Sequence, residues 1–106
     1  MSVEIYGVDP ETEDFPTLIV AGEATFNALW QPAIDALGLI RIGNIRWLYR
    51  TDLPEILEEL RRLSEAPLPA LPTEERETLA RSAARLRREL AERWDAHPQA
   101  ARLWMG

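Results

Sequence analysis

A glycine–asparagine pair, Gly43-Asn44, separates two runs of strand-forming residues, 39–42 and 45–50. Such a pair is typical of a two-residue hairpin turn, because the turn needs central residues that accept positive φ angles. The turn length sets the strand register, with residue 42 opposite residue 45 and residue 39 opposite residue 48. We therefore expect an antiparallel hairpin over residues 39–50.

That register separates the side chains of the hairpin onto two faces. One face is expected to be buried, with Trp47 in the core, and the other is expected to present arginines. The first face carries Ile40, Ile42, Ile45, Trp47 and Tyr49, and the second carries Leu39, Arg41, Arg46, Leu48 and Arg50. A shift of one residue would exchange the two sets.

The rest of the N-terminal half predicts two more strands and a helix. Residues 3–8 and 17–21 are short runs rich in β-branched and other apolar residues, which favour strands. Residues 23–37 carry apolar side chains at three- and four-residue steps, which indicates an amphipathic helix. Pro32 interrupts it, so we expect either a kink at residues 30–31 or two short helices that meet there.

The C-terminal half predicts two long helices joined by a stiff connector. Thr51-Asp52 precedes a helix with an apolar stripe that reaches Leu63, and Pro54 occupies its first turn. Residues 66–72 contain three prolines and predict an extended connector. A long helix is expected over residues 73–96, and residues 99–105 are expected to form a further short helical piece.

These elements predict a single α+β domain spanning residues 1–106. We expect a small, mostly antiparallel sheet of about four strands, which includes the 39–50 hairpin, packed with three helices in the order ββαββαα. The chain has no cysteine, so its 106 residues must be held together by one hydrophobic core without disulfides.

Charge is distributed unevenly along the chain, although the formal net charge is −6. Residues 1–37 contain no base and seven acids, which are Glu4, Asp9, Glu11, Glu13, Asp14, Glu23 and Asp35. One interpretation is that this acidic part faces the basic C-terminal part within the fold. The other is that its acidic surface attracts a basic partner.

The arginines of the hairpin carry a second binding hypothesis. Arg41 and Arg46 are predicted to lie opposite each other, which is unfavourable for like charges without compensation. Carboxylates of the first 37 residues are one source of compensation, and an external anion or acidic partner at Arg41, Arg46 and Arg50 is the other. The overall acidity argues against nucleic acid as that partner.

Trp104 is the fourth tryptophan of the chain and lies between Leu103 and Met105. Tryptophan, methionine and arginine are enriched at protein interfaces. Docking of this segment on the domain and docking on another chain therefore both remain open.

Sequence patterns for catalysis are weak. The five glycines are isolated, no serine lies in a Gly-x-Ser-x-Gly turn, and His97 is the one histidine. Glu55-x-x-Glu58 and Glu92-x-x-Asp95 resemble the acid pairs with which helical nucleotide pyrophosphohydrolases hold magnesium, but they lie opposite the apolar stripes of their helices. We expect no metal site and no cofactor.

The leading functional hypothesis is a small acidic, non-enzymatic binding protein of the inhibitor, antitoxin or immunity type that masks a basic partner protein. The candidate partner-binding residues are Asp9, Glu11, Glu13, Asp14, Arg41, Arg46, Arg50 and Trp104. The alternatives are a homo-oligomeric structural or regulatory subunit that assembles through the C-terminal helix, and a divalent-metal-dependent nucleotide hydrolase. The sequence contains no apolar segment long enough for a membrane-spanning helix, and we expect a cytoplasmic protein.

Overall fold

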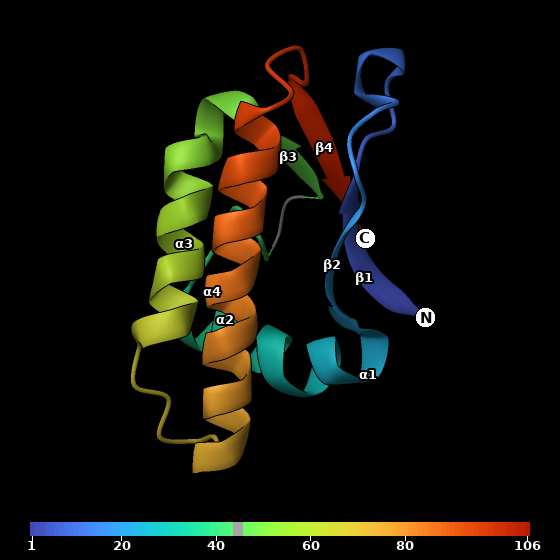
Figure 1. Ribbon diagram of the computed structural model, residues 1–106. Coiled ribbons are helices and arrows are strands. Elements are labelled where there is room, and N and C mark those ends of the chain that lie inside the picture. The colour runs from blue at the N-terminus through green and yellow to red at the C-terminus, as the bar shows by residue number, and fades with distance from the viewer. Residues whose placement is uncertain (44–45) are drawn as a thin grey trace.

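The computed structural model describes residues 1–43 and 46–106 as an α+β fold, in which a four-stranded antiparallel sheet packs on helices (Figure 1). The strands are β1 (Ser2–Tyr6), β2 (Leu18–Gly22), β3 (Trp47–Tyr49) and β4 (Arg102–Met105). Their order in the sheet is β2-β1-β4-β3, and every neighbouring pair is antiparallel. The predicted fold class and the four-stranded antiparallel sheet are thus confirmed.

The fourth strand comes from a different part of the chain than expected. Residues 99–105 do not form a helical piece, because Arg102–Met105 is β4 and lies between β1 and β3. Leu103 and Met105 point into the core, while Arg102 and Trp104 lie on the opposite face. This two-residue alternation is that of a strand that is buried on one side.

The first half of the predicted 39–50 hairpin is not a strand. Residues 41–43 form a turn, and three consecutive N–H groups, those of Ile40, Arg41 and Ile42, donate to the carboxylate of Glu59. Those donors are therefore not free for a sheet ladder, and β4 takes the place beside β3. The predicted turn residue Asn44 lies outside the described residues.

The segment after β2 is helical without interruption from Glu23 to Leu37, so the chain accommodates Pro32 through a change of helix type and not through a break between two helices. α1 (Glu23–Thr25) continues into a wider π-helical turn (Phe26–Trp30), and α2 (Gln31–Leu37) follows with Pro32 in its first turn. The wide turn accommodates the proline, which lacks an N–H group for the helix ladder. Gly38 ends α2 with a φ of 65°, a left-handed conformation that glycine adopts without strain.

Two long helices cover one face of the sheet. α3 (Leu53–Glu65) and α4 (Thr73–Asp95) pack side by side and match the predicted segments closely. Their stripes meet the inner face of the sheet in one core, with Leu60, Ala83, Leu90, Trp94 and Leu103 fully buried. No helix in the described part of the chain has the length and apolar character needed to cross a bilayer.

Candidate interaction surface

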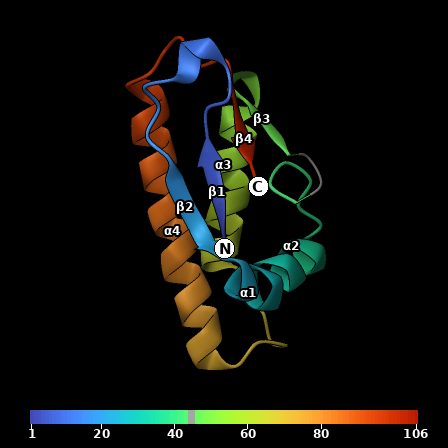
Figure 2. The same ribbon diagram turned by 90° about the vertical axis from the view of Figure 1, so that its right-hand side faces the viewer.

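No helix among the described residues covers the second face of the sheet. In Figure 2 the four strands lie in front of α3 and α4, so the face turned toward the viewer is open. The pairing register and the burial pattern assign eight side chains to this outer face, which are Ser2, Glu4, Tyr6, Ile19, Trp47, Tyr49, Arg102 and Trp104. We call these residues the outer sheet face.

An aromatic row crosses three strands at the centre of this face. Tyr6 on β1 is the register partner of Trp104 on β4, and Trp104 is in turn the register partner of Trp47 on β3. The two indole rings meet edge to face, with centroids 4.9 Å apart and planes at 79°. Edge-to-face contact is a favourable geometry for aromatic pairs, so the row is a packed patch that remains partly open to solvent.

Arg102 extends this patch and links it to the N-terminal loop. Its guanidinium carbon lies 4.0 Å from the ring centroid of Trp47, and its Nε and Nη2 atoms donate to the two Asp9 carboxylate oxygens at 2.9 and 3.1 Å. The hydrogen bond from Arg102 holds the pKa of Asp9 below its usual value of 3.8, and the same bond raises the pKa of Arg102. The arginine is thus fixed between a carboxylate and an aromatic ring.

The acidic loop after β1 extends beyond the end of the sheet (Figure 1). Its 3-10 turn (Pro10–Thr12) is stabilised by the Thr12 hydroxyl, which donates to the Asp9 carbonyl oxygen at 2.8 Å. Thr12 and Phe15 are buried and anchor the loop. The Phe15 and His97 rings pack edge to face, with their centroids 5.2 Å apart. The side chains of Glu11, Glu13 and Asp14 consequently project into solvent beside the outer sheet face.

The three predicted arginines do not form one cluster. Arg41 makes an ion pair with Asp52 at 3.5 Å, and Arg50 Nη1 donates to the carbonyl oxygens of Trp94 and His97 at the end of α4. Arg46 is exposed, and its guanidinium makes no ion pair within the described part of the chain. Arg41 and Arg46 do not face each other across a hairpin, so the repulsion expected from that register does not arise.

The acidic and basic ends of the chain do meet, through Asp9 and Arg102. Their pair joins the acidic segment of residues 1–37 to the basic C-terminal segment. It accounts for one of the four predicted acids of the loop. The carboxylates of the other three make no ion pair with any residue that the structure describes.

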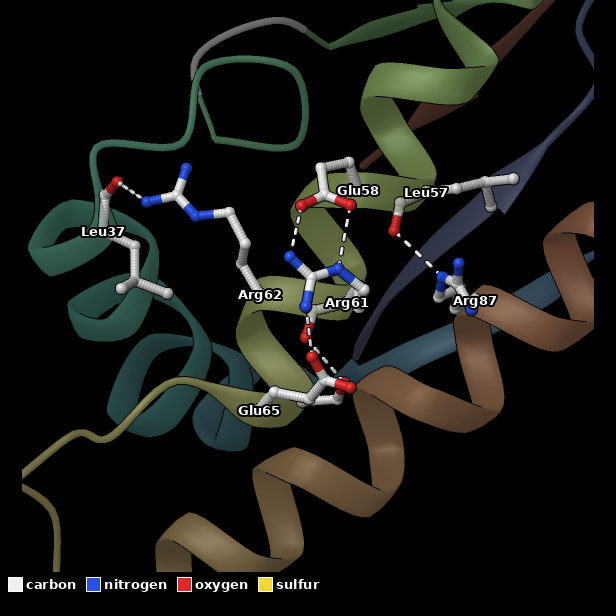
Figure 3. Close-up of polar contacts among 8 residues, drawn as sticks. Leu37, Leu57, Glu58, Arg61, Arg62, Glu65 and Arg87 are labelled. Atoms are coloured by element: carbon white, nitrogen blue, oxygen red, sulfur yellow. Dashed lines mark hydrogen bonds and ion pairs between the residues drawn. The ribbon is translucent and has the colours of Figure 1, made fainter.

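Two acidic side chains of α3, Glu58 and Glu65, are engaged by an arginine of the same helix. Arg61 lies between Glu58 and Glu65 and pairs with both, which lowers the pKa of Glu58 (Figure 3). Arg62 instead donates to the carbonyl oxygen of Leu37, and Arg87 of α4 donates to that of Leu57. Across residues 1–43 and 46–106, no group of three or more histidine and acidic side chains is arranged to hold a metal ion.

Sequence reasoning missed much of the outer sheet face. The sequence predicts Trp47 in the core, but Leu48 is the buried residue of β3, with 1% exposure, while Trp47 is partly exposed and Tyr49, on the same face, is 42% exposed. Both faces of this segment carry large apolar groups, so alternation alone does not show which face is buried. The alternation in residues 102–105 is the signal that could have placed Arg102 beside Trp104.

Comparison of the chain with protein-family models, curated protein sequences and solved structures found no match. The functional argument therefore rests on the outer sheet face itself.

Proposed function

We propose that this chain is a protein-binding module that docks a basic partner on its outer sheet face. The aromatic row formed by Tyr6, Trp104 and Trp47 carries the proposal. Tryptophan, tyrosine and arginine dominate the energetics of protein interfaces, and here they are grouped on the one sheet face that no helix covers. A patch of this composition is suited to bury against a partner surface.

The acidic loop supports a partner of positive charge. Glu11, Glu13 and Asp14 project at the end of the outer sheet face, and Glu4 lies on that face itself. Arg102, by contrast, is neutralised by Asp9. A rim of carboxylates raises the association rate and the specificity for a basic surface, whereas the apolar centre supplies most of the affinity. Masking a basic protein in this way is the action of an inhibitor or immunity-type protein.

The aromatic contribution is tested by affinity capture from the cell that makes the protein. Immobilised wild-type chain is compared with Tyr49→Ala and Trp104→Ala, and Ile40→Ala is the matched control because Ile40 is an exposed apolar residue outside the sheet, with 52% exposure. We expect both aromatic variants to lose the captured protein and Ile40→Ala to retain it. Equal capture by all four chains, each shown by circular dichroism to be folded, would overturn the proposal.

The charge contribution is tested by reversing the exposed acids of the loop. The triple change of Glu11, Glu13 and Asp14 to arginine should abolish capture without unfolding the chain, because these side chains make no ion pair with the described residues. The control makes the same change in charge on the exposed side of α4, at Glu77, Glu92 and Asp95. Capture that survives the loop reversal, or is lost equally in the control, contradicts the acidic-rim assignment.

A further inference from the structure

The two edges of the sheet differ in length and charge. β3 is three residues long and is followed directly by Arg50 and preceded directly by Arg46. β2 is five residues long, and no charged residue occurs from Phe15 to Gly22. Edge strands of soluble monomers are usually short or carry charges and prolines that prevent pairing with another chain. Within its five residues β2 has neither a charge nor a proline, although a bulge in its ladder with β1 leaves Val20 without a register partner and Glu23 follows it directly.

The outer edge of β2 has unpaired backbone groups. β1 is the one ladder partner of β2, and residues 17–21 make no backbone hydrogen bond of a turn, loop or cap within the described part of the chain. α4 packs against β2 from behind the sheet (Figure 2). The N–H and C=O groups that face away from β1 are therefore available to another strand.

We infer that β2 pairs with β2 of a second copy of this chain, antiparallel across a two-fold axis, to form one continuous sheet of both copies. An antiparallel pair of identical strands is self-complementary, because each outward N–H group of one copy meets a C=O group of the other. The absence of charge from Phe15 to Gly22 lets two chains, each of net charge −6, approach without opposing like charges in the paired strands. A basic partner is a less suitable occupant of this edge, because residues 15–22 contain no carboxylate with which it could form an ion pair.

The side chain at the centre of the edge fits the same occupant. Ile19 points to the outer sheet face and is 57% exposed, whereas its neighbours Leu18 and Val20 point into the core. Pairing in a register centred on Ile19 would bring the two Ile19 side chains of the dimer into contact. The two-fold axis that relates two such antiparallel strands is perpendicular to the sheet, so both outer sheet faces would lie on the same side of the dimer.

The dimer is tested by sedimentation equilibrium of the full chain between about 5 and 200 µM, a range suited to a small interface. We expect the wild-type mass to double with concentration and Ile19→Lys to weaken dimerisation by at least about tenfold, since two lysines would meet in the paired strands. Ile40→Lys is the matched control, because it adds the same charge at a similarly exposed isoleucine away from β2, and it should dimerise like wild type. A monomeric wild-type chain, or equal effects of the two lysines, overturns the inference.

Hydrogen exchange of the wild-type chain provides a second test that needs no variant. The backbone amides at the outer edge of β2 should gain protection as the concentration rises, and unchanged exchange there would contradict pairing. The inference does not depend on the proposed function: Trp104→Ala should lose the basic partner and still dimerise, because Trp104 is on β4, which β1 separates from β2. Failure of the dimer would appear in sedimentation equilibrium, whereas failure of partner docking would appear in affinity capture, so the two failures can be distinguished.

Discussion

Two buried tryptophans differ in one hydrogen bond. Trp94 Nε1 donates to the carbonyl oxygen of Ala100 at 2.7 Å, whereas Trp30 Nε1 has no partner within the described residues, although both rings are at most 1% exposed. A buried donor without an acceptor loses its hydration and gains nothing in return. The two indoles are therefore equivalent in burial and unequal in polar satisfaction.

This contrast predicts unequal responses to phenylalanine. Trp94→Phe should lower the free energy of unfolding by about 1–3 kcal/mol more than Trp30→Phe, because the first change orphans a carbonyl oxygen and the second removes an unsatisfied N–H group. Urea unfolding of both variants measures the difference. Equal losses would show that the N–H group of Trp30 is satisfied in solution.

The Asp9–Arg102 pair predicts a pH-dependent contribution to stability. The folded-state pKa of Asp9 is below its ordinary value of 3.8, so the pair stabilises the fold above that value and ceases to do so as the pH falls through the lowered pKa. Asp9→Asn should therefore be less stable than wild type at about pH 7, and the difference should narrow as the pH is lowered below 3.8 toward about pH 2. Urea unfolding at the two pH values checks this, with Asp14→Asn as the control from the same loop. A stability gap that persists in acid would contradict it.

At the scale of elements, the segment between α2 and β3 is shaped by a side chain rather than by a backbone ladder. The Glu59 carboxylate, which is 9% exposed, accepts the N–H groups of Ile40, Arg41 and Ile42 at 3.0–3.3 Å. A carboxylate that accepts several backbone N–H bonds is a strong local anchor. It fixes the chain where it turns from the helices toward β3.

Replacement of this anchor should be costly. In Glu59→Gln one acceptor oxygen becomes an NH2 donor that faces the three N–H groups, and we expect a loss of about 2–3 kcal/mol in the free energy of unfolding. Glu58→Gln on the exposed side of the same helix should cost less than about 1 kcal/mol, because its pair with Arg61 is at the surface. Chemical unfolding measures both losses, and faster exchange of the three amides should accompany the first. Similar losses would rule out the anchoring role.

Helices could be predicted here better than strand positions. α3 and α4 each have one apolar stripe and one charged side, so their periodicity has a single interpretation. Trp47-Leu48-Tyr49 is apolar on both faces, and the anchoring role of Glu59 depends on a residue 17 or more positions away. Of the candidate site, the acidic loop and Trp104 were predictable from local composition. The row that unites Tyr6, Trp104 and Trp47 was not, because it exists only once distant strands pair.

At the scale of the whole molecule, the sheet depends on its C-terminal strand. β4 lies between β1 and β3 and places Leu103 and Met105 in the core, so β3 has no sheet partner without it. Deletion of residues 102–106 should therefore abolish cooperative thermal unfolding, as followed by circular dichroism. Trp104→Ala should keep a cooperative transition, because that side chain lies on the outer face. A truncated chain that still melts cooperatively would mean that helices and the β1–β2 pair form a stable unit alone.

The central position of β4 also constrains how the protein is made. Chains leave the ribosome from the N-terminus, so β1, β2 and β3 are all synthesised before the strand that joins them. Until β4 emerges, β1 and β3 each present an open edge, and the apolar faces of α3 and α4 lack part of the surface that they cover in the finished fold. The sheet of the nascent chain therefore cannot be completed before β4 has been synthesised. The time needed to translate the chain as far as β4 thus sets the earliest moment at which the outer sheet face can form.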